Sequence, residues 1–139
     1  MFPNAQMREA FAEADYIVLC VRASAENENL TDAGALKAMK KGVIIVNIAR
    51  GSLIDETALI EGLKSGQVAY AGVDVVKDEP VNANNPMLSL PQSLTTPHVA
   101  GPTDITLKGM IAYVTQAAKD FSKGKKPMAL VNNPQSPRA

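Results

Sequence analysis

Cysteine, histidine and aromatic residues are scarce in this chain of 139 residues, which has one cysteine, one histidine and no tryptophan. The single Cys20 excludes an internal disulfide bond and is typical of a reducing compartment. We predict no metal site. Fourteen basic and fourteen acidic side chains balance each other without forming a basic cluster, which argues against binding to nucleic acid.

Long apolar runs are also missing. No run is long enough to span a membrane, and the first segment, "MFPNAQMREAF", lacks the apolar core of a signal peptide. Apolar residues make up 46% of the chain and charged residues 20%, as in an ordinary globular domain. We therefore expect a cytoplasmic protein with no membrane partner.

Three short apolar runs alternate with segments of helical periodicity. The runs are rich in β-branched residues, as in strands of a parallel sheet, and they occupy residues 16–21, 42–49 and 68–76. Helical spacing precedes each run, in residues 4–14, 31–41 and 55–66. Alternating helices and strands predict an α/β fold built from right-handed βαβ units.

Capping residues define where the helices begin and end. Asp55 is a suitable N-cap with Gly66 as the stop, and either Thr31 or Asp32 begins the preceding helix. After an irregular connection rich in proline and asparagine, "SLTT" predicts a fourth, short strand. A long helix follows over residues 102–123, with Pro102 in its first turn and Gly124 after its end.

Ionisable side chains follow three of these strands. Arg50 comes after the second, Asp74 and Glu79 after the third, and His98 after the last short one. Because ligands bind outside the carboxyl ends of parallel strands, we expect these four groups to converge at one edge of the sheet. Each also has a structural interpretation: Arg50 as an ion-pair partner, Asp74 as a turn residue, Glu79 as a solvated charge, and His98 as a satisfied histidine.

The segment "MKKGVIIVNIARGSLIDETALIEGLKSGQVAYAGVDVVKDEP", together with "TTPHVAG", resembles the D-isomer-specific 2-hydroxyacid dehydrogenases. The resemblance covers roughly residues 10–132. It implies the C-terminal half of a doubly wound, Rossmann-type parallel sheet with a long C-terminal helix. Residues 1–124 would then be part of a dinucleotide-binding domain, and residues 125–139 a tail that returns toward a substrate domain.

The same resemblance implies roles for individual residues. Arg50 would bind the substrate carboxylate, Glu79 and His98 would be the catalytic pair, and Asp74 would contact the nicotinamide. The remaining cofactor-binding positions, besides Arg50, Asp74 and His98, would be Val21, Ile48, Ala49 and Gly101.

These residue types suit the reduction of a 2-keto acid. The reaction adds a hydride to carbon and a proton to oxygen, so it needs an acid that works near neutral pH, and histidine is one. A carboxylate that is hydrogen-bonded to the imidazole favours the charged form of the imidazole. The planar guanidinium of an arginine binds a carboxylate through two hydrogen bonds. The resemblance therefore implies hydride transfer between a nicotinamide cofactor and a D-2-hydroxy acid.

Part of the family pattern is absent from this sequence. There is no G-x-G-x-x-G turn to cradle a pyrophosphate, and arginine replaces the more usual proline at Arg22. Half of a doubly wound sheet would leave its first strand at an edge and its apolar faces partly uncovered. We expect the isolated chain to be inactive and to bind dinucleotide weakly.

Three interpretations remain open from the sequence. The chain is a truncated dehydrogenase, a non-catalytic relative that senses dinucleotide and binds proteins, as the C-terminal binding protein corepressors do, or an inactive remnant. The resemblance implies NAD as the cofactor, with NADP not excluded, and a homodimer when the protein is complete.

Overall fold

The computed structural model describes residues 6–126, which belong to two compact units, with the boundary along the chain between Ala100 and Gly101. The assignment of residues 1–124 to one domain stays a prediction. Most of the expected tail, residues 127–139, lies outside the described residues.

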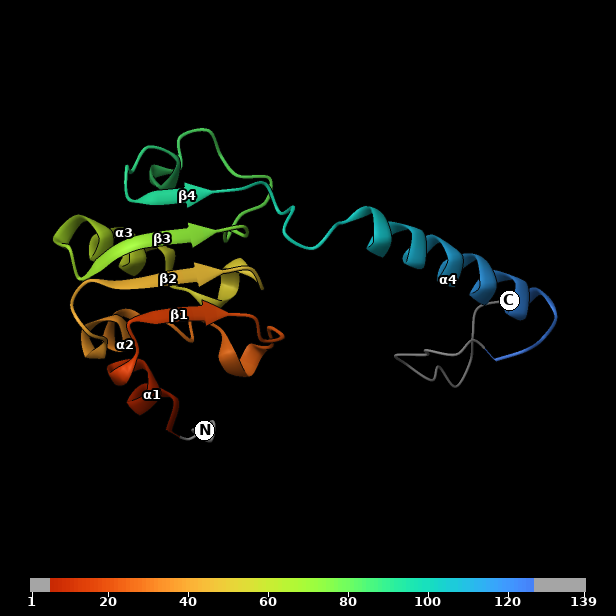
Figure 1. Ribbon diagram of the computed structural model, residues 1–139, viewed down its shortest axis with the longest axis horizontal. Coiled ribbons are helices and arrows are strands. Elements are labelled where there is room, and N and C mark those ends of the chain that lie inside the picture. The colour runs from red at the N-terminus through yellow and green to blue at the C-terminus, as the bar shows by residue number, and fades with distance from the viewer. Residues whose placement is uncertain (1–5, 127–139) are drawn as a thin grey trace. The chain divides into compact units, whose positions relative to one another are not determined.

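The first unit is an α/β structure whose four strands are all parallel, in the order β1-β2-β3-β4 (Figure 1). This confirms the predicted fold class. The strands are β1 (Tyr16–Leu19), β2 (Val43–Asn47), β3 (Val68–Val73) and β4 (Ser93–Thr95). The helices are α1 (Met7–Glu13), α2 (Ala33–Ala38) and α3 (Glu56–Ser65), with short 3-10 turns at Ala25–Asn27, Gly51–Leu53 and Pro86–Leu88.

The predicted helix ends of this unit are confirmed. The Asp32 carboxylate accepts a hydrogen bond from the Ala35 N–H at 2.6 Å, so Asp32 rather than Thr31 is the N-cap of α2. Asp55 caps α3 in the same way through Ala58. Gly66 ends α3 with a φ of 74°, a conformation that glycine adopts without strain.

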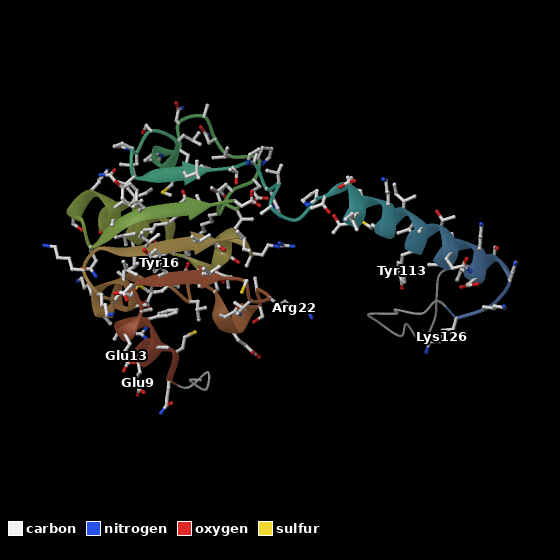
Figure 2. The ribbon with its side chains drawn as sticks, viewed as in Figure 1. Glu9, Glu13, Tyr16, Arg22, Tyr113 and Lys126 are labelled. Carbon is white, nitrogen blue, oxygen red and sulfur yellow. The ribbon has the colours of Figure 1, made fainter. Side chains whose placement is uncertain are left out.

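One face of the sheet carries the core. Alternate side chains such as Ile17 and Ile45 point toward α2 and α3, which lie behind the sheet in Figure 1, and are almost fully buried there. The opposite face is exposed in this unit: Tyr16, labelled in Figure 2, is 72% exposed and Tyr70 is 58% exposed. β1 lies at the edge of the sheet. Both features were expected for half of a doubly wound sheet.

The second unit contains the long helix α4 (Asp104–Ser122). Its N-cap is Thr103, whose hydroxyl accepts from the Thr106 N–H, so the placement of Pro102 in the first turn was wrong. Thr103 offers a side-chain acceptor that proline lacks, and it therefore takes the capping position. Gly124 follows the helix with a φ of 69°, as expected for a helix stop.

Candidate active site

The parallel strands carry the predicted residues to one edge of the sheet, because all four run in the same direction (Figure 1). Asp74 directly follows β3, and its N–H donates to the Asn47 carbonyl at the end of β2, at 2.9 Å. The His98 N–H in turn donates to the Asp74 carbonyl, also at 2.9 Å. The ends of β2, β3 and the loop after β4 are therefore linked through their backbones.

The turn that carries Arg50 is held by a buried asparagine. Asn47 is 1% exposed; its side-chain amide donates to the Arg50 carbonyl at 2.8 Å and accepts from the Ala49 N–H at 3.1 Å. The Arg50 guanidinium donates to the Ala49 carbonyl at 2.6 Å. Asn47 was not predicted to have a role, although a polar residue at the end of the run "VIIVN" was the available signal.

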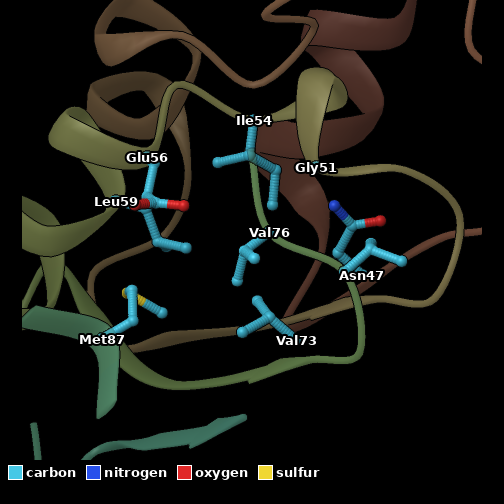
Figure 3. A pocket seen from close by; sticks show the side chains of 9 residues that line it. Asn47, Gly51, Ile54, Glu56, Leu59, Val73, Val76 and Met87 are labelled. Atoms are coloured by element: carbon cyan, nitrogen blue, oxygen red, sulfur yellow. The ribbon is translucent and has the colours of Figure 1, made fainter. Parts of the chain in front are cut away.

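Gly51 brings this turn close to the segment after β3. A Cβ atom at this position would clash with the carbonyl group and neighbouring backbone of Val76. The two backbones can approach only because glycine has no side chain. Figure 3 shows Gly51 and Val76 beside a cavity of about 10 Å³, which has room for one water molecule at most and so is no substrate site.

Asp74 anchors the loop that contains His98. Its carboxylate accepts three hydrogen bonds, from the Thr96 hydroxyl at 2.5 Å and from the backbone N–H groups of Val99 and Ala100 at 2.9 Å. Burial raises the pKa of Asp74, but these hydrogen bonds outweigh it and hold the pKa below its ordinary value of 3.8. Asp74 is therefore ionised at neutral pH, although only 6% of it is exposed.

His98 and Glu79 form a direct pair. The His98 Nδ1 lies 2.8 Å from the Glu79 Oε2, and the two side chains are 43% and 39% exposed. The other Glu79 oxygen accepts from the Val76 N–H at 3.3 Å. The hydrogen bond from His98 lowers the pKa of Glu79 below 4.5; partial burial opposes it, and the charge of Arg50 makes a smaller contribution in the same direction.

Because an ionised carboxylate only accepts hydrogen bonds, the bonded Nδ1 of His98 must carry a proton. The other ring nitrogen, Nε2, has no hydrogen bond with any described residue. The pair thus leaves one ring nitrogen without a partner among the described residues, and a neutral or charged imidazole of this kind can exchange a proton.

The predicted residues line two hollows at this edge. One, of about 410 Å³, includes Asp74, Glu79 and His98 in its lining. The other, of about 520 Å³, is lined by Val21, Ile48, Ala49 and Arg50 together with Cys20, Arg22 and Ala23. Figure 2 shows Arg22 beyond the carboxyl end of β1. Gly101 belongs to the second unit, so its position relative to these hollows is not defined.

Residues 6–126 contain neither a metal-binding cluster nor a membrane-spanning helix. No group of histidine, cysteine, aspartate and glutamate side chains in that range could hold a metal ion. No helix in the described part of the chain is long and apolar enough to cross a membrane.

Comparison with known proteins identifies the family. Residues 2–100 match the model of the D-isomer specific 2-hydroxyacid dehydrogenase, NAD binding domain. The chain belongs to this family. The matched range ends where the first compact unit ends, so it contains the strands, Arg50, Asp74, Glu79 and His98.

Relatives share both sequence and fold with this chain. A glyoxylate reductase from Pyrococcus horikoshii is 36% identical over 126 residues, which are 91% of this chain and 37% of the relative. A D-3-phosphoglycerate dehydrogenase from Archaeoglobus fulgidus is 37% identical, over 88% of this chain and 23% of its own length. The crystal structure of the TT0316 protein from Thermus thermophilus superimposes with a TM-score of 0.86 at 32% identity, covering 91% of this chain and 40% of that one. The chain thus spans less than half the length of each of these three relatives.

Proposed function

We propose that this chain supplies the acid–base pair and the carboxylate-binding arginine of an NAD-dependent oxidoreductase that interconverts 2-keto acids and D-2-hydroxy acids. The observation that carries the proposal is the 2.8 Å contact between His98 and Glu79, at the sheet edge where Arg50 also lies. Membership of the family supports the reaction class.

In reduction, His98 donates a proton from Nε2 to the carbonyl oxygen of the keto acid. The nicotinamide cofactor, when bound, would supply the hydride for the carbonyl carbon. Glu79 holds the ring through Nδ1 and stabilises the imidazolium before transfer. In the reverse direction the neutral ring accepts the hydroxyl proton at the same nitrogen.

Arg50 binds the carboxylate of the substrate. Its planar guanidinium matches a carboxylate with two parallel hydrogen bonds and fixes which carbon faces the cofactor. Arg50→Lys should therefore raise the KM for the keto acid far more than it changes the affinity for NADH, because a point charge does not reproduce the two-pronged contact. An unchanged kcat/KM would assign Arg50 a structural role.

The second hollow fits part of a dinucleotide. Val21 and Ile48 are about half exposed there and offer apolar surface for a flat ring, and Arg22 and Arg50 offer positive charge for anionic groups. Ala49 lies between these residues in the lining. Asp74 has one lone pair left on Oδ2 for a donor such as a carboxamide, since three of about four acceptor positions are used. Gly101 as a cofactor contact, NAD over NADP, and a homodimer remain part of the proposal.

A chimeric enzyme tests the proposal directly. The 126 matching residues of the Pyrococcus horikoshii glyoxylate reductase are replaced by those of this chain, and oxidation of NADH and NADPH is followed with glyoxylate or hydroxypyruvate. We expect turnover, and a loss of about 10²–10⁴ in kcat for His98→Gln with little change in NADH affinity.

The isolated chain of 139 residues serves as the matched negative control, because its sequence has no Gly-rich turn. We expect it to show no turnover and no micromolar NADH binding. A chimera that folds and binds NADH but does not reduce keto acids would contradict the proposed reaction and favour the role of a non-catalytic sensor.

A further inference from the structure

His98 has an unusual backbone conformation. Its φ is 55°, in the left-handed region that residues other than glycine seldom adopt. The loop that contains it, residues 96–100, follows a strand of only three residues, so β4 by itself fixes the loop weakly. Such a conformation persists only where the surrounding contacts impose it.

The contacts that impose it converge on one residue. Asp74 binds the loop before His98, through the Thr96 hydroxyl, and after it, through the N–H groups of Val99 and Ala100. The Asp74 carbonyl accepts from the N–H of His98 itself. Asp74 is buried and comes directly after β3, one of the two inner strands of the sheet, so it is a rigid point of attachment.

We propose that Asp74 and Thr96 are positioning residues, which hold the loop of residues 96–100 so that His98 places Nδ1 on Glu79 and leaves Nε2 free. The catalytic meaning of this arrangement rests on the proposed function. The arrangement itself belongs to the chain alone and can be measured without substrate or cofactor.

Thr96 permits a mild test, because it is half-buried and makes its contact through a single hydroxyl. Thr96→Val removes the hydroxyl and keeps the shape, and Thr96→Ser keeps the hydroxyl. Thr95→Val is the matched control, since the Thr95 hydroxyl contacts Ser93, at 3.3 Å, and not Asp74.

Asp74→Asn tests the other partner. One carboxylate oxygen becomes an NH₂ group, which in either orientation faces a backbone N–H, that of Ala100 or that of Val99. The NH₂ group and the backbone N–H are both donors, so the hydrogen bond that the carboxylate oxygen accepted there is lost. If this buried substitution prevents folding, as judged by circular dichroism, the Thr96 variants decide the question.

The measurement is ¹⁵N NMR of the full 139-residue chain, in which His98 is the only histidine and gives an unambiguous imidazole signal. In the parent we expect the neutral ring to carry its proton on Nδ1. The imidazole signal of the Glu79→Gln variant shows the change expected when the carboxylate partner is lost completely. Thr96→Val should produce at least half of that change, with amide exchange at Val99 and Ala100 about tenfold faster and the pKa of Glu79 raised toward its ordinary value.

Thr96→Ser should restore all three readouts, and Thr95→Val should match the parent. The proposal is overturned if Thr96→Val keeps the parent imidazole signal and exchange rates, or if Thr95→Val changes them equally. These readouts involve no turnover, so an inactive chimera with an intact Thr96 effect would refute the proposed reaction and leave the positioning role standing.

Discussion

A lone histidine gains its significance from what surrounds it. His98 by itself is compatible with a structural role, but its ring meets an ionised Glu79 at 2.8 Å and its backbone is held in a left-handed conformation. Neither side chain belongs to the buried core, because 43% of the His98 side chain and 39% of the Glu79 side chain are exposed. The exposed pair is better suited to proton exchange with a ligand than to stabilising the fold, since exposed ion pairs contribute little.

The His98–Glu79 pair predicts a pH dependence. In the proposed reaction an ionised Glu79 holds Nδ1 of His98, and the hydrogen bond from His98 keeps the pKa of Glu79 below 4.5, so the parent should lose keto-acid reduction only as the pH falls through that lowered pKa, and Glu79→Gln should lack this acid limb. The check is the pH profile of kcat/KM in the chimeric enzyme for the parent and Glu79→Gln. A profile that stays in place would show that the pair is not coupled.

Gly51 gives a second prediction at the scale of a residue. Gly51→Ala puts a methyl group into the Val76 backbone, so the turn after β2 must move away from the segment after β3. We expect a loss of about 1–3 kcal/mol or more in the free energy of unfolding, measured with urea. Gly109→Ala in α4 is the control: its Cβ would meet nothing within 4 Å, so this exchange should be neutral or slightly stabilising.

At the scale of elements, the caps decide where helices begin. The α2 helix has only six residues, too few to be stable by itself, so its N-cap and its packing against α1 and α3 maintain it. Asp32 provides that cap and also pairs with Arg8 of α1 at 3.0 Å. One side chain thus links the start of one helix to another helix.

Asp32→Ala should therefore lower the free energy of unfolding by about 1 kcal/mol, within a range of about 0.5–2. Asp15→Ala is the control, because Asp15 makes an exposed ion pair with Lys40 and caps no helix. That control should change stability by less than about 0.5 kcal/mol. Equal losses in the two variants would show that the cap contributes nothing beyond a surface charge.

At the scale of the whole molecule, three carboxylates link stability to pH. The pKa values of Asp32, Asp74 and Glu79 are all lowered in the folded chain. In Asp32 and Asp74, hydrogen bonds to the carboxylate outweigh the opposing effect of burial. In Glu79, the hydrogen bond from His98 is the largest cause. At a pH between the folded-state and the unfolded-state pKa values of these groups, the unfolded chain therefore binds more protons than the folded chain. Their contribution to stability is present above the unfolded values, near pH 4 to 5, and is lost as the pH falls through the folded values.

The melting temperature should accordingly change little between pH 7 and 5 on account of these groups and fall below about pH 4. Asp32→Asn retains a good N-cap but removes one titrating group. Its melting temperature should fall less steeply with acid than that of the parent. If the melting temperatures of the parent and of Asp32→Asn fell equally steeply with decreasing pH, the assignment of Asp32 as an acid-sensitive site would be contradicted.

The sequence alone determined the class of fold and the chemical inventory of the site. Continuous β-branched runs, Asp55 as a cap and Gly66 as a stop depend on neighbours a few residues away, and such local preferences can be read directly. Arg50, Asp74, Glu79 and His98 could be placed at one edge because parallel strands share a direction. Pro102 was misplaced because its fit to a first turn did not show that the neighbouring Thr103 takes the cap.

Tertiary structure decided the roles that depend on contacts between distant segments. Asp74 reaches across 22 residues to Thr96, and Gly51 matters only because the backbone of Val76 passes beside it. Nothing in the neighbourhood of Thr96 distinguishes it from Thr95, yet only Thr96 bonds to Asp74. The sequence named the candidate site residues, whereas packing between strand ends determined which residues hold them in place, because hydrogen bonds and steric contacts exist only between groups that the fold has brought together.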